Sequence, residues 1–392
     1  MKYNFDEIVD RKGTNSAKWS KELLEQRFGD GELLPLWVAD IDFKCPKPVV
    51  DAFVERAKHG IYGYSERMSP YYQSIINWNK RRNNWEIKKE WILFTPGIVP
   101  AINLLVRTSS FPGDKVIIQN PVYYPFNVAI LNNGRHIQYN PLKYENSRCT
   151  MDYKDLEEKA KDPRVKLLIL CSPHNPVGQV WTKEELTKLG EICIKNNIIV
   201  ISDEVHSDLI LKGHKHTPFA SISEEFAQHC ITCTAPSKTF NLAGLQTSNI
   251  IIPNERLRIY FSQTLESNAI RMPNAFGIVA LRTAYNEGEG WLEQVLEYLN
   301  KDVCFIEEFV KEKMPEVKFI KPEGTYLAWL DFTALGKNEK EIEMIIQKKA
   351  KIALDEGYVF GKGGERFKRI NFACPQYILE RALNRIEEAI HN

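Results

Sequence analysis

The sequence predicts an α/β fold with a mostly parallel central sheet flanked by helices. Short, continuous apolar runs alternate with helical patterns from about residue 90 onward, which is typical of parallel strands buried on both faces. Between two of these runs, Thr182 and Glu185 form a capping-box pattern, and apolar residues follow at helical spacing. This is a βαβ unit, so a ligand site is expected outside the carboxyl ends of the strands. The predicted strands are 115–119, 166–171, 198–202, 230–234 and 248–252.

The last hundred residues follow a different pattern and predict a smaller α+β domain. Amphipathic helices are expected over 291–313, 339–357 and 376–391, and an alternating strand over 325–332. The N-terminal segment has no strand of the central type, so we expect it to pack as an arm partly on this unit. We therefore predict a large α/β domain over 46–285 and a small domain made from 1–45 and 286–392.

Composition excludes several classes of protein. With 392 residues and roughly 150 per domain, two or three domains are expected. The 52 Lys and Arg residues against 51 Asp and Glu residues leave a net charge of +1, which indicates neither a nucleic-acid nor an anionic membrane partner. Eight cysteines are too sparse for a disulfide scaffold. The N-terminus lacks a secretory pattern and the apolar runs are too short to span a membrane, so we expect a cytoplasmic protein.

Three polar motifs directly follow predicted strands. They are CSPHNPVG at 171–178, SDEVH at 202–206 and APSKTFNLAG at 235–244. Each alone has a simpler interpretation: a turn, a helix cap or a surface loop. Because the carboxyl ends of parallel strands meet at one edge of the sheet, their joint order favours a shared site there.

These motifs, in this order and spacing, resemble those of the fold-type I pyridoxal phosphate enzymes in the class I/II aminotransferase group. Further motifs resemble more narrowly the carbon–sulfur β-lyases of the cystathionine β-lyase type, and the match spans nearly the whole chain. The resemblance implies pyridoxal 5′-phosphate (PLP) as cofactor, a PLP-dependent transferase-like fold and a homodimer with active sites at its interface. The further motifs are LWVADIDF (36–43), IYGY (61–64), TPGIVPA (95–101), PVYYPF (121–126), QVWT (179–182) and RINFACP (369–375).

The resemblance gives Lys238 and Asp203 the central roles. Lys238 is implied to hold the cofactor as an imine and then to act as general base. This requires a deprotonated amine, although an unperturbed lysine has a pKa of about 10.4. Asp203 is implied to lie beside the ring nitrogen, where a buried carboxylate keeps that nitrogen protonated and the ring electron-withdrawing. The alternatives are an exposed loop lysine and a structural helix cap.

Three more residues are implied to contact the cofactor ring. Asn175 matches the residue that bonds the phenolic oxygen, with a turn-forming asparagine as the alternative. Tyr123 matches the aromatic residue that stacks on the ring, and Tyr124 is its rival. His206 stands where aminotransferases often have a tyrosine that bonds the ring oxygen, and the alternatives are that His206 makes this bond or that no residue replaces it.

The cofactor phosphate requires backbone donors at a helix start together with hydroxyl groups or cations. The amides of Gly97 and Ile98 precede a predicted helix over 99–108, and Ser237 adds a hydroxyl. Tyr64 resembles the tyrosine with which one subunit of family members contacts the cofactor phosphate bound to the other subunit of a dimer. Tyr62 is its rival, and core packing is the alternative for both.

Recognition of an amino-acid carboxylate calls for an arginine, whose planar fork matches it. Arg369 matches the family's C-terminal arginine, with a surface salt bridge as the alternative. Ala39 lies where the N-terminal arm usually adds a backbone donor, and Tyr123 and Asn175 also border the expected substrate position. Gln246 stands where the broader aminotransferase pattern has a phosphate-binding arginine, which favours the lyase group.

The predicted reaction is α,β-elimination of a thiol from cystathionine or another cysteine S-conjugate, giving pyruvate and ammonia. An amino-acid aminotransferase is the alternative, because both reactions begin with the same proton removal. A non-catalytic PLP-binding regulator is more remote, since we expect no added basic DNA-binding domain. No metal site is predicted: the two cysteines of the CITC run at 230–233 should face opposite sides of a strand, and the loop at 212–215 is solvated.

Overall fold

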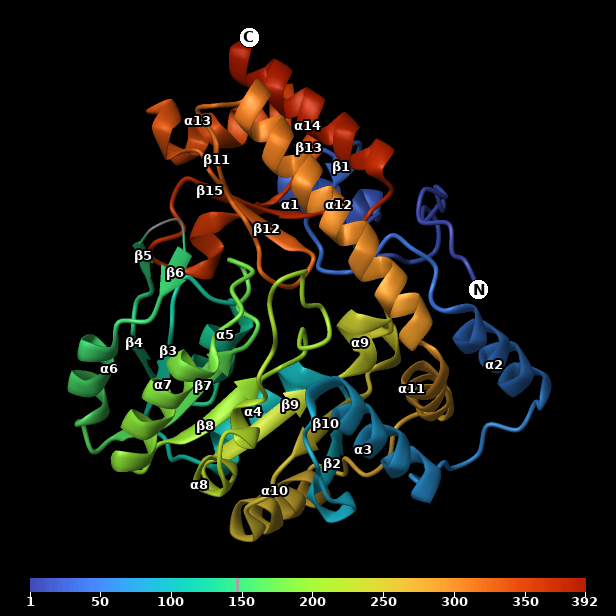
Figure 1. The fold of residues 1–392 in the computed structure, drawn as a ribbon, viewed down its shortest axis with the longest axis vertical. Helices are drawn as coiled ribbons and strands as arrows, with labels where there is room; N and C mark the ends of the chain where they lie inside the picture. Colours follow the sequence, from blue (N-terminus) through green and yellow to red (C-terminus); the bar gives the residue numbers. More distant parts are fainter. Residues whose placement is uncertain (146–147) are drawn as a thin grey trace.

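The computed structural model describes residues 1–145 and 148–392 and is organised around a seven-stranded sheet (Figure 1). The strand order is β2-β10-β9-β8-β7-β3-β4. Only β10 runs antiparallel to its neighbours, so the sheet is mostly parallel, as predicted. The strands are β2 (Ile92–Thr95), β3 (Lys115–Ile118), β4 (His136–Tyr139), β7 (Val165–Cys171), β8 (Ile199–Asp203), β9 (Cys230–Thr234) and β10 (Ser248–Ile251).

All five apolar runs form strands of the central sheet, and its other two strands, β2 and β4, were not predicted. The run at 248–252 becomes the antiparallel β10, because an apolar run indicates burial and not direction. The edge strand β4 has the sequence HIQY and no fully buried residue, so it lacks the continuous apolar pattern. A short hairpin of β5 (Lys143–Glu145) and β6 (Arg148–Thr150) was also not predicted.

Helices cover both faces of this sheet. One buried cluster contains side chains of α4, α5 and α10, and a second contains side chains of α3, α6, α7, α8 and α11. Cys230 belongs to one cluster and Cys233 to the other, so they point to opposite faces as expected. The helices are α2 (Lys47–Lys58), α3 (Ser69–Asn83), α4 (Ile98–Thr108), α5 (Pro125–Asn132), α6 (Tyr153–Ala160), α7 (Lys183–Lys195), α8 (Glu224–Gln228), α10 (Glu255–Ser267) and α11 (Ala275–Glu287).

The helix α7 begins as its sequence predicts. The Thr182 hydroxyl accepts a hydrogen bond from the Glu185 amide at 3.2 Å, and the Glu185 carboxylate accepts one from the Thr182 amide at 2.8 Å. These two bonds satisfy backbone donors that a helix start otherwise leaves unpaired. The capping box is therefore confirmed.

A second, antiparallel sheet has the order β11-β12-β15-β14 and lies above the central one in Figure 1. The long helix α12 and the closing helix α14 lie against it. The predicted strand at 325–332 and the helices at 291–313 and 376–391 are confirmed. The elements are α12 (Glu289–Lys313), β11 (Lys318–Ile320), β12 (Leu327–Asp331), α13 (Glu339–Glu343), β13 (Ile352–Ala353), β14 (Asp355–Glu356), β15 (Phe367–Asn371) and α14 (Gln376–His391).

The helix predicted over 339–357 is wrong in its second half. Helix α13 continues as a π-helical turn over Met344–Lys349, and Lys351 then adopts a left-handed conformation with φ of 58°. A residue in this conformation ends a helix. The chain continues as β13, which pairs in parallel with β1 (Leu34–Pro35) of the N-terminal arm.

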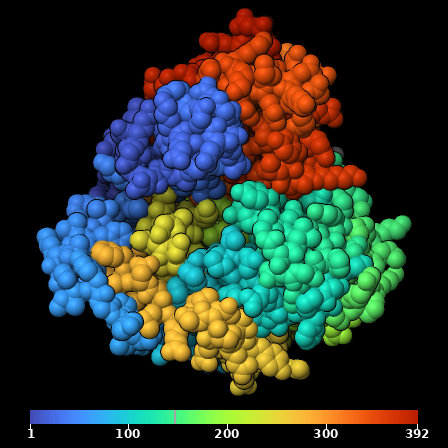
Figure 2. Space-filling model, turned by 180° about the vertical axis from the view of Figure 1, so that it is seen from behind, coloured from blue at the N-terminus to red at the C-terminus, as the bar shows by residue number. Residues whose placement is uncertain are grey.

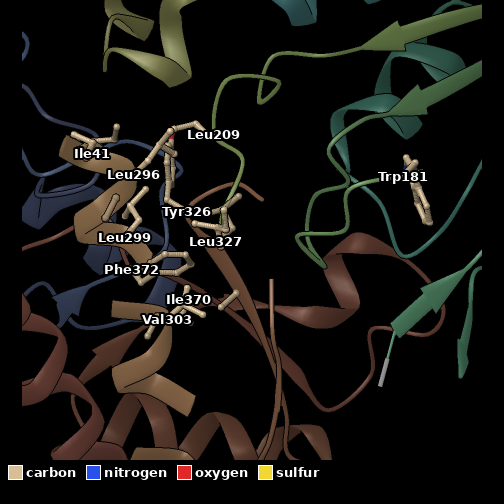
Figure 3. Close-up of a cluster of buried hydrophobic side chains, with 14 of the residues drawn as sticks. Ile41, Trp181, Leu209, Leu296, Leu299, Val303, Tyr326, Leu327, Ile370 and Phe372 are labelled. Carbon is tan, nitrogen blue, oxygen red and sulfur yellow. The ribbon is translucent and has the colours of Figure 1, made fainter. Parts of the chain in front are cut away.

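The N-terminal arm packs on the C-terminal sheet, as expected (Figure 2). The Asn371 amide donates to the Leu36 carbonyl, and the Asp42 amide donates to the Ala373 carbonyl, each at 2.9 Å. Figure 3 shows Ile41 of the arm in one apolar cluster with side chains of α12 and β12. No helix among the described residues is long and apolar enough to cross a membrane.

Candidate active site

A cavity of about 210 Å³ lies at the carboxyl ends of β7, β8 and β9. Side chains and backbone from all three polar motifs line it, together with the N-terminus of α4 and the arm. The sheet therefore brings together most of the predicted site residues, which are more than a hundred positions apart in the chain. Those that line the cavity are Ala39, Gly97, Ile98, Tyr123, Asn175, Asp203, His206, Ser237 and Lys238.

Lys238 enters this cavity from the short helix α9 (Pro236–Thr239), which directly follows β9. Its Nζ donates to the Ala39 carbonyl at 2.8 Å. Burial, aided by the positive charge of Arg369, lowers the pKa of the Lys238 amine to about 8. The deprotonated amine is thus far more available near neutral pH than in an ordinary lysine, as a nucleophile and general base requires.

Asp203 is the last residue of β8 and is 4% exposed. Its carboxylate accepts a hydrogen bond from the Val205 amide at 3.2 Å, and no cation of the described chain forms an ion pair with it. Burial raises the pKa of Asp203 to about 7. A cationic N–H group placed in the cavity would stabilise its ionised form.

The cofactor-free Asp203→Asn variant is expected to be more stable than the unsubstituted protein above pH 7. The folded-state pKa of Asp203 is raised from 3.8 to about 7, so the folded state binds more protons between these values. The stability of the unsubstituted protein should therefore fall as pH rises through this window, by on the order of 4 kcal/mol for this group. Urea unfolding at pH 5 and pH 8 measures the difference, and equal pH dependence of both proteins would contradict it.

Arg369 lies on β15 and contacts Asn175 through its guanidinium group. Its side chain is only 4% exposed, which rules out a surface salt bridge as its role. Its Nη1 donates to Asn175 Oδ1 at 3.0 Å, and its Nη2 donates to the Trp37 carbonyl at 2.7 Å and to the Asp355 carboxylate. The Nε atom is buried and has no partner among the described residues. A buried donor without an acceptor is costly, so this atom is suited to a ligand carboxylate.

The start of α4 offers backbone donors to an anion, although not the expected pair. Gly97, with φ of 104°, turns so that its own amide donates to the Thr95 carbonyl at 2.8 Å. The amides of Ile98 and Val99 donate no hydrogen bond within the described residues, nor does the Ser237 hydroxyl. All four residues line the cavity, but the Gly97 amide is already paired, so the donors open to an anion are Ile98, Val99 and Ser237. A phosphate site here stays a prediction.

The predicted aromatic residues take distinct positions. Tyr123 lines the cavity, whereas Tyr124 does not and is 37% exposed. The rival Tyr62 donates to the Ala57 carbonyl at 2.6 Å. Tyr64 is fully exposed on the loop between α2 and α3, outside the cavity of its own chain. Core packing is thus excluded for Tyr64.

His206 is buried against Tyr326, with ring centroids 5.8 Å apart. Its Nδ1 has no hydrogen-bond partner in the part of the chain that the structure describes. Burial, with the nearby charges of Lys238 and Arg369, lowers the pKa of His206 well below its usual value. The imidazole is thus neutral at physiological pH, with Nδ1 unsatisfied next to the cavity.

Comparison of the sequence with known proteins identifies the family to which the chain belongs. Residues 33–386 match the model of the aminotransferase class I and II family. The chain belongs to this family. Cystathionine beta-lyase PatB of Bacillus subtilis is 44% identical, over 99% of this chain and all of that protein.

Solved structures of this family superpose closely. Cystalysin from Treponema denticola, described as containing pyridoxal 5′-phosphate, is 39% identical with a TM-score of 0.96, covering 100% of this chain and 99% of cystalysin. The PLP-bound C–S lyase from Staphylococcus hominis is 34% identical with a TM-score of 0.93, covering 100% and 99%.

Several residues that shape the site were missed by sequence reasoning. Asp355 and the Trp37 carbonyl hold Arg369, and the Tyr326 hydroxyl donates to the Ala39 carbonyl at 3.0 Å. Asn241 anchors the arm, because its Nδ2 donates to the Ile41 carbonyl at 2.7 Å. Asn241 lies in the SKTFNLAG motif, which could have indicated it. No local pattern indicates Asp355.

Proposed function

We propose that the protein is a PLP-dependent carbon–sulfur β-lyase that removes a thiol from cystathionine or a related cysteine S-conjugate. The observation that carries this proposal is the cavity that places Lys238, an amine of lowered pKa, near Asn175, which accepts a hydrogen bond from Arg369 behind the cavity lining. The full-length likeness to PatB supports the choice of the sulfur substrate.

The residues present fit PLP. The unpartnered amides of Ile98 and Val99 at a helix N-terminus suit its phosphate, and the buried Asp203 suits its pyridine nitrogen. Asn175 and the unsatisfied His206 Nδ1 suit its ring oxygen. When bound, PLP supplies a sink for the electrons of the substrate's α-carbon.

Side chains of the protein would then orient the substrate and accept its α-proton. Arg369 binds the substrate carboxylate, which fixes the α-carbon relative to Lys238. The Lys238 amine accepts the α-proton, and Asp203 holds a proton at the pyridine nitrogen. The C–S bond breaks as the thiolate leaves, and the released aminoacrylate hydrolyses to pyruvate and ammonia.

Replacement of Arg369 by lysine is expected to lower kcat/KM by roughly 30- to 100-fold, mainly through a higher KM. Lysine keeps the charge but cannot supply a planar fork to a carboxylate. Steady-state assays of thiol release from cystathionine measure the effect. The matched control is Arg366→Lys, in the same segment but with an exposed side chain. Equal kinetics for Arg369→Lys and the control would contradict the assignment.

An aminotransferase is the second candidate function, favoured by the family match. Against it, Gln246 lines the cavity where the broader aminotransferase pattern has an arginine. The deciding experiment incubates the holoenzyme with cystathionine, with and without a 2-oxo acid. Pyruvate and thiol released without the acid support the lyase, whereas turnover that depends on the acid contradicts it.

We further propose a homodimer in which Tyr64 reaches the phosphate of the partner subunit. The side chain of Tyr64 is fully exposed, and neighbouring apolar side chains at Ile61 and Met68 are also largely exposed. Such a group of apolar side chains is typical of a surface that another chain covers.

Mixing two weakly active variants tests this arrangement. Tyr64→Ala and Lys238→Ala are each expected to lose most activity, because one lacks the phosphate contact and the other the base. If Tyr64 acts in the partner's site, subunit exchange restores activity by forming hybrids with one intact site. The assay is pyruvate formation before and after exchange. No recovery, with exchange verified by mass spectrometry, would place Tyr64 outside the partner's site.

A further inference from the structure

A second cavity, of about 590 Å³, lies between the N-terminal arm and α14. The arm contributes residues from 11 to 34, including the start of α1 (Lys21–Phe28), and α14 contributes Arg381 and Arg385. Its lining shares no residue with the candidate active site. Its volume is within the range of small-molecule sites, roughly 300 to 1,000 Å³.

Positive charge in this cavity exceeds negative charge. Arg381 and Arg385 lie one helical turn apart, a spacing at which like charges destabilise a helix. Neither forms an ion pair or a side-chain hydrogen bond within residues 1–145 and 148–392, and Lys12 forms no ion pair there either. Burial and the charge of Arg381 lower the pKa of Arg385. The cavity thus gathers three cations that form no ion pair among the described residues, although the nearby carboxylate of Glu388 partly offsets the charge of Arg385.

The other charges of the lining are already paired. Arg11 bonds Asp40 at 2.6 Å and Asp42 at 2.5 Å, and Lys21 bonds Glu32 at 2.5 Å. Among the described residues, Glu32 is the only acid that lines the cavity. An incoming anion would therefore interact with Lys12, Arg381 and Arg385 without displacing these pairs.

The lining also offers a polar and an apolar contact. The Ser16 hydroxyl oxygen is buried and has no hydrogen-bond partner among the described residues. Trp19, whose Nε1 donates to Asp42 at 2.9 Å, is held in place beside Leu24 and Leu34. These side chains can contact the carbon skeleton of a ligand while the cations bind its charged groups.

We propose that this cavity binds a small polyanion that carries phosphate or carboxylate groups, at a site separate from the active site. The same arm supplies the Ala39 carbonyl to Lys238 and the Trp37 carbonyl to Arg369. The ligand would therefore contact a segment that also holds two groups of the candidate active site.

Isothermal titration of the holoenzyme with citrate and, separately, with inorganic pyrophosphate tests the proposal at low ionic strength. The holoenzyme is used because its phosphate site is filled by PLP. Binding of either probe is expected, and the better probe identifies a carboxylate or a phosphate ligand. The double variant Arg381→Ala/Arg385→Ala should bind each probe with at least roughly tenfold lower affinity, because charge-assisted bonds are lost.

Two further variants provide matched controls. Lys311→Ala removes an exposed, unpaired cation on α12, outside the cavity, and should bind as the unsubstituted protein does. Glu32→Gln removes the only acid of the lining and releases Lys21, so binding should become several-fold tighter. The proposal is overturned if neither probe binds, if the double variant binds with unchanged affinity, or if Glu32→Gln fails to tighten binding.

Discussion

Replacing Lys238 by alanine is expected to lower kcat by at least roughly 10³-fold and to abolish covalent attachment of PLP. The loss of a positioned general base alone accounts for about 10²- to 10⁴-fold. No other lysine lines the cavity in the described part of the chain, so no neighbouring amine can replace it. Pyruvate formation measures activity, and borohydride reduction followed by peptide mass spectrometry measures attachment.

Two controls separate the amine's chemistry from its charge. Lys238→Arg keeps a positive charge but remains protonated, so it should be as inactive as the alanine variant. A small added amine such as methylamine can accept a proton in the space that alanine leaves, and it should partly restore turnover. Covalent PLP found on another lysine, with activity retained in Lys238→Ala, would contradict both the anchor and the base assignments.

Asp203→Asn is expected to lower kcat by roughly 10²- to 10³-fold while preserving the shape of the site. Asp203 is the only carboxylate that lines the cavity of the described chain, so the substitution removes the negative charge facing the pyridine nitrogen. Removing one partner of a buried charged pair costs about 2 to 5 kcal/mol, which covers this range. Single-turnover measurements of α-proton removal, with a deuterated substrate, show whether that step is the one affected.

Asp302→Asn is the matched control for this effect. Asp302 on α12 is 1% exposed, and burial raises its pKa to about 8, but it does not line the cavity. Both variants remove a buried acid, yet only Asp203→Asn should lose activity. An equal loss in the two would indicate that burial of an acid, and not its place beside PLP, is what matters.

Sequence patterns predict the parts of this site that follow local rules. The strands before Asp203 and Lys238 are continuous apolar runs, and parallel strand ends meet at one edge. The capping box at Thr182 is equally local, because its two bonds span three residues. The predicted sheet therefore suffices to place the residues of the family-like motifs around one cavity.

Other parts depend on contacts between distant segments. Asp355 holds Arg369 only because β14 and β15 pair, and nothing near Asp355 in the sequence indicates this. The helix predicted over 339–357 ends early because Lys351 turns left-handed and the chain pairs with β1, although its apolar spacing continues. The Gly97 amide likewise bonds Thr95 through a turn whose backbone angles the motif does not specify.

The arm that joins the two ends of the chain has a consequence for synthesis on the ribosome. Trp37 and Arg369 are 332 positions apart, yet one hydrogen bond joins them in the finished site. At about 5 to 20 residues per second, roughly 15 to 65 seconds pass between the synthesis of the arm and the synthesis of the strands that it packs against. During that interval Leu34, Leu36 and Ile41 have no sheet to cover them. The nascent chain therefore presents an apolar segment to chaperones until its last strand emerges, and a chain stopped before β15 cannot assemble the site.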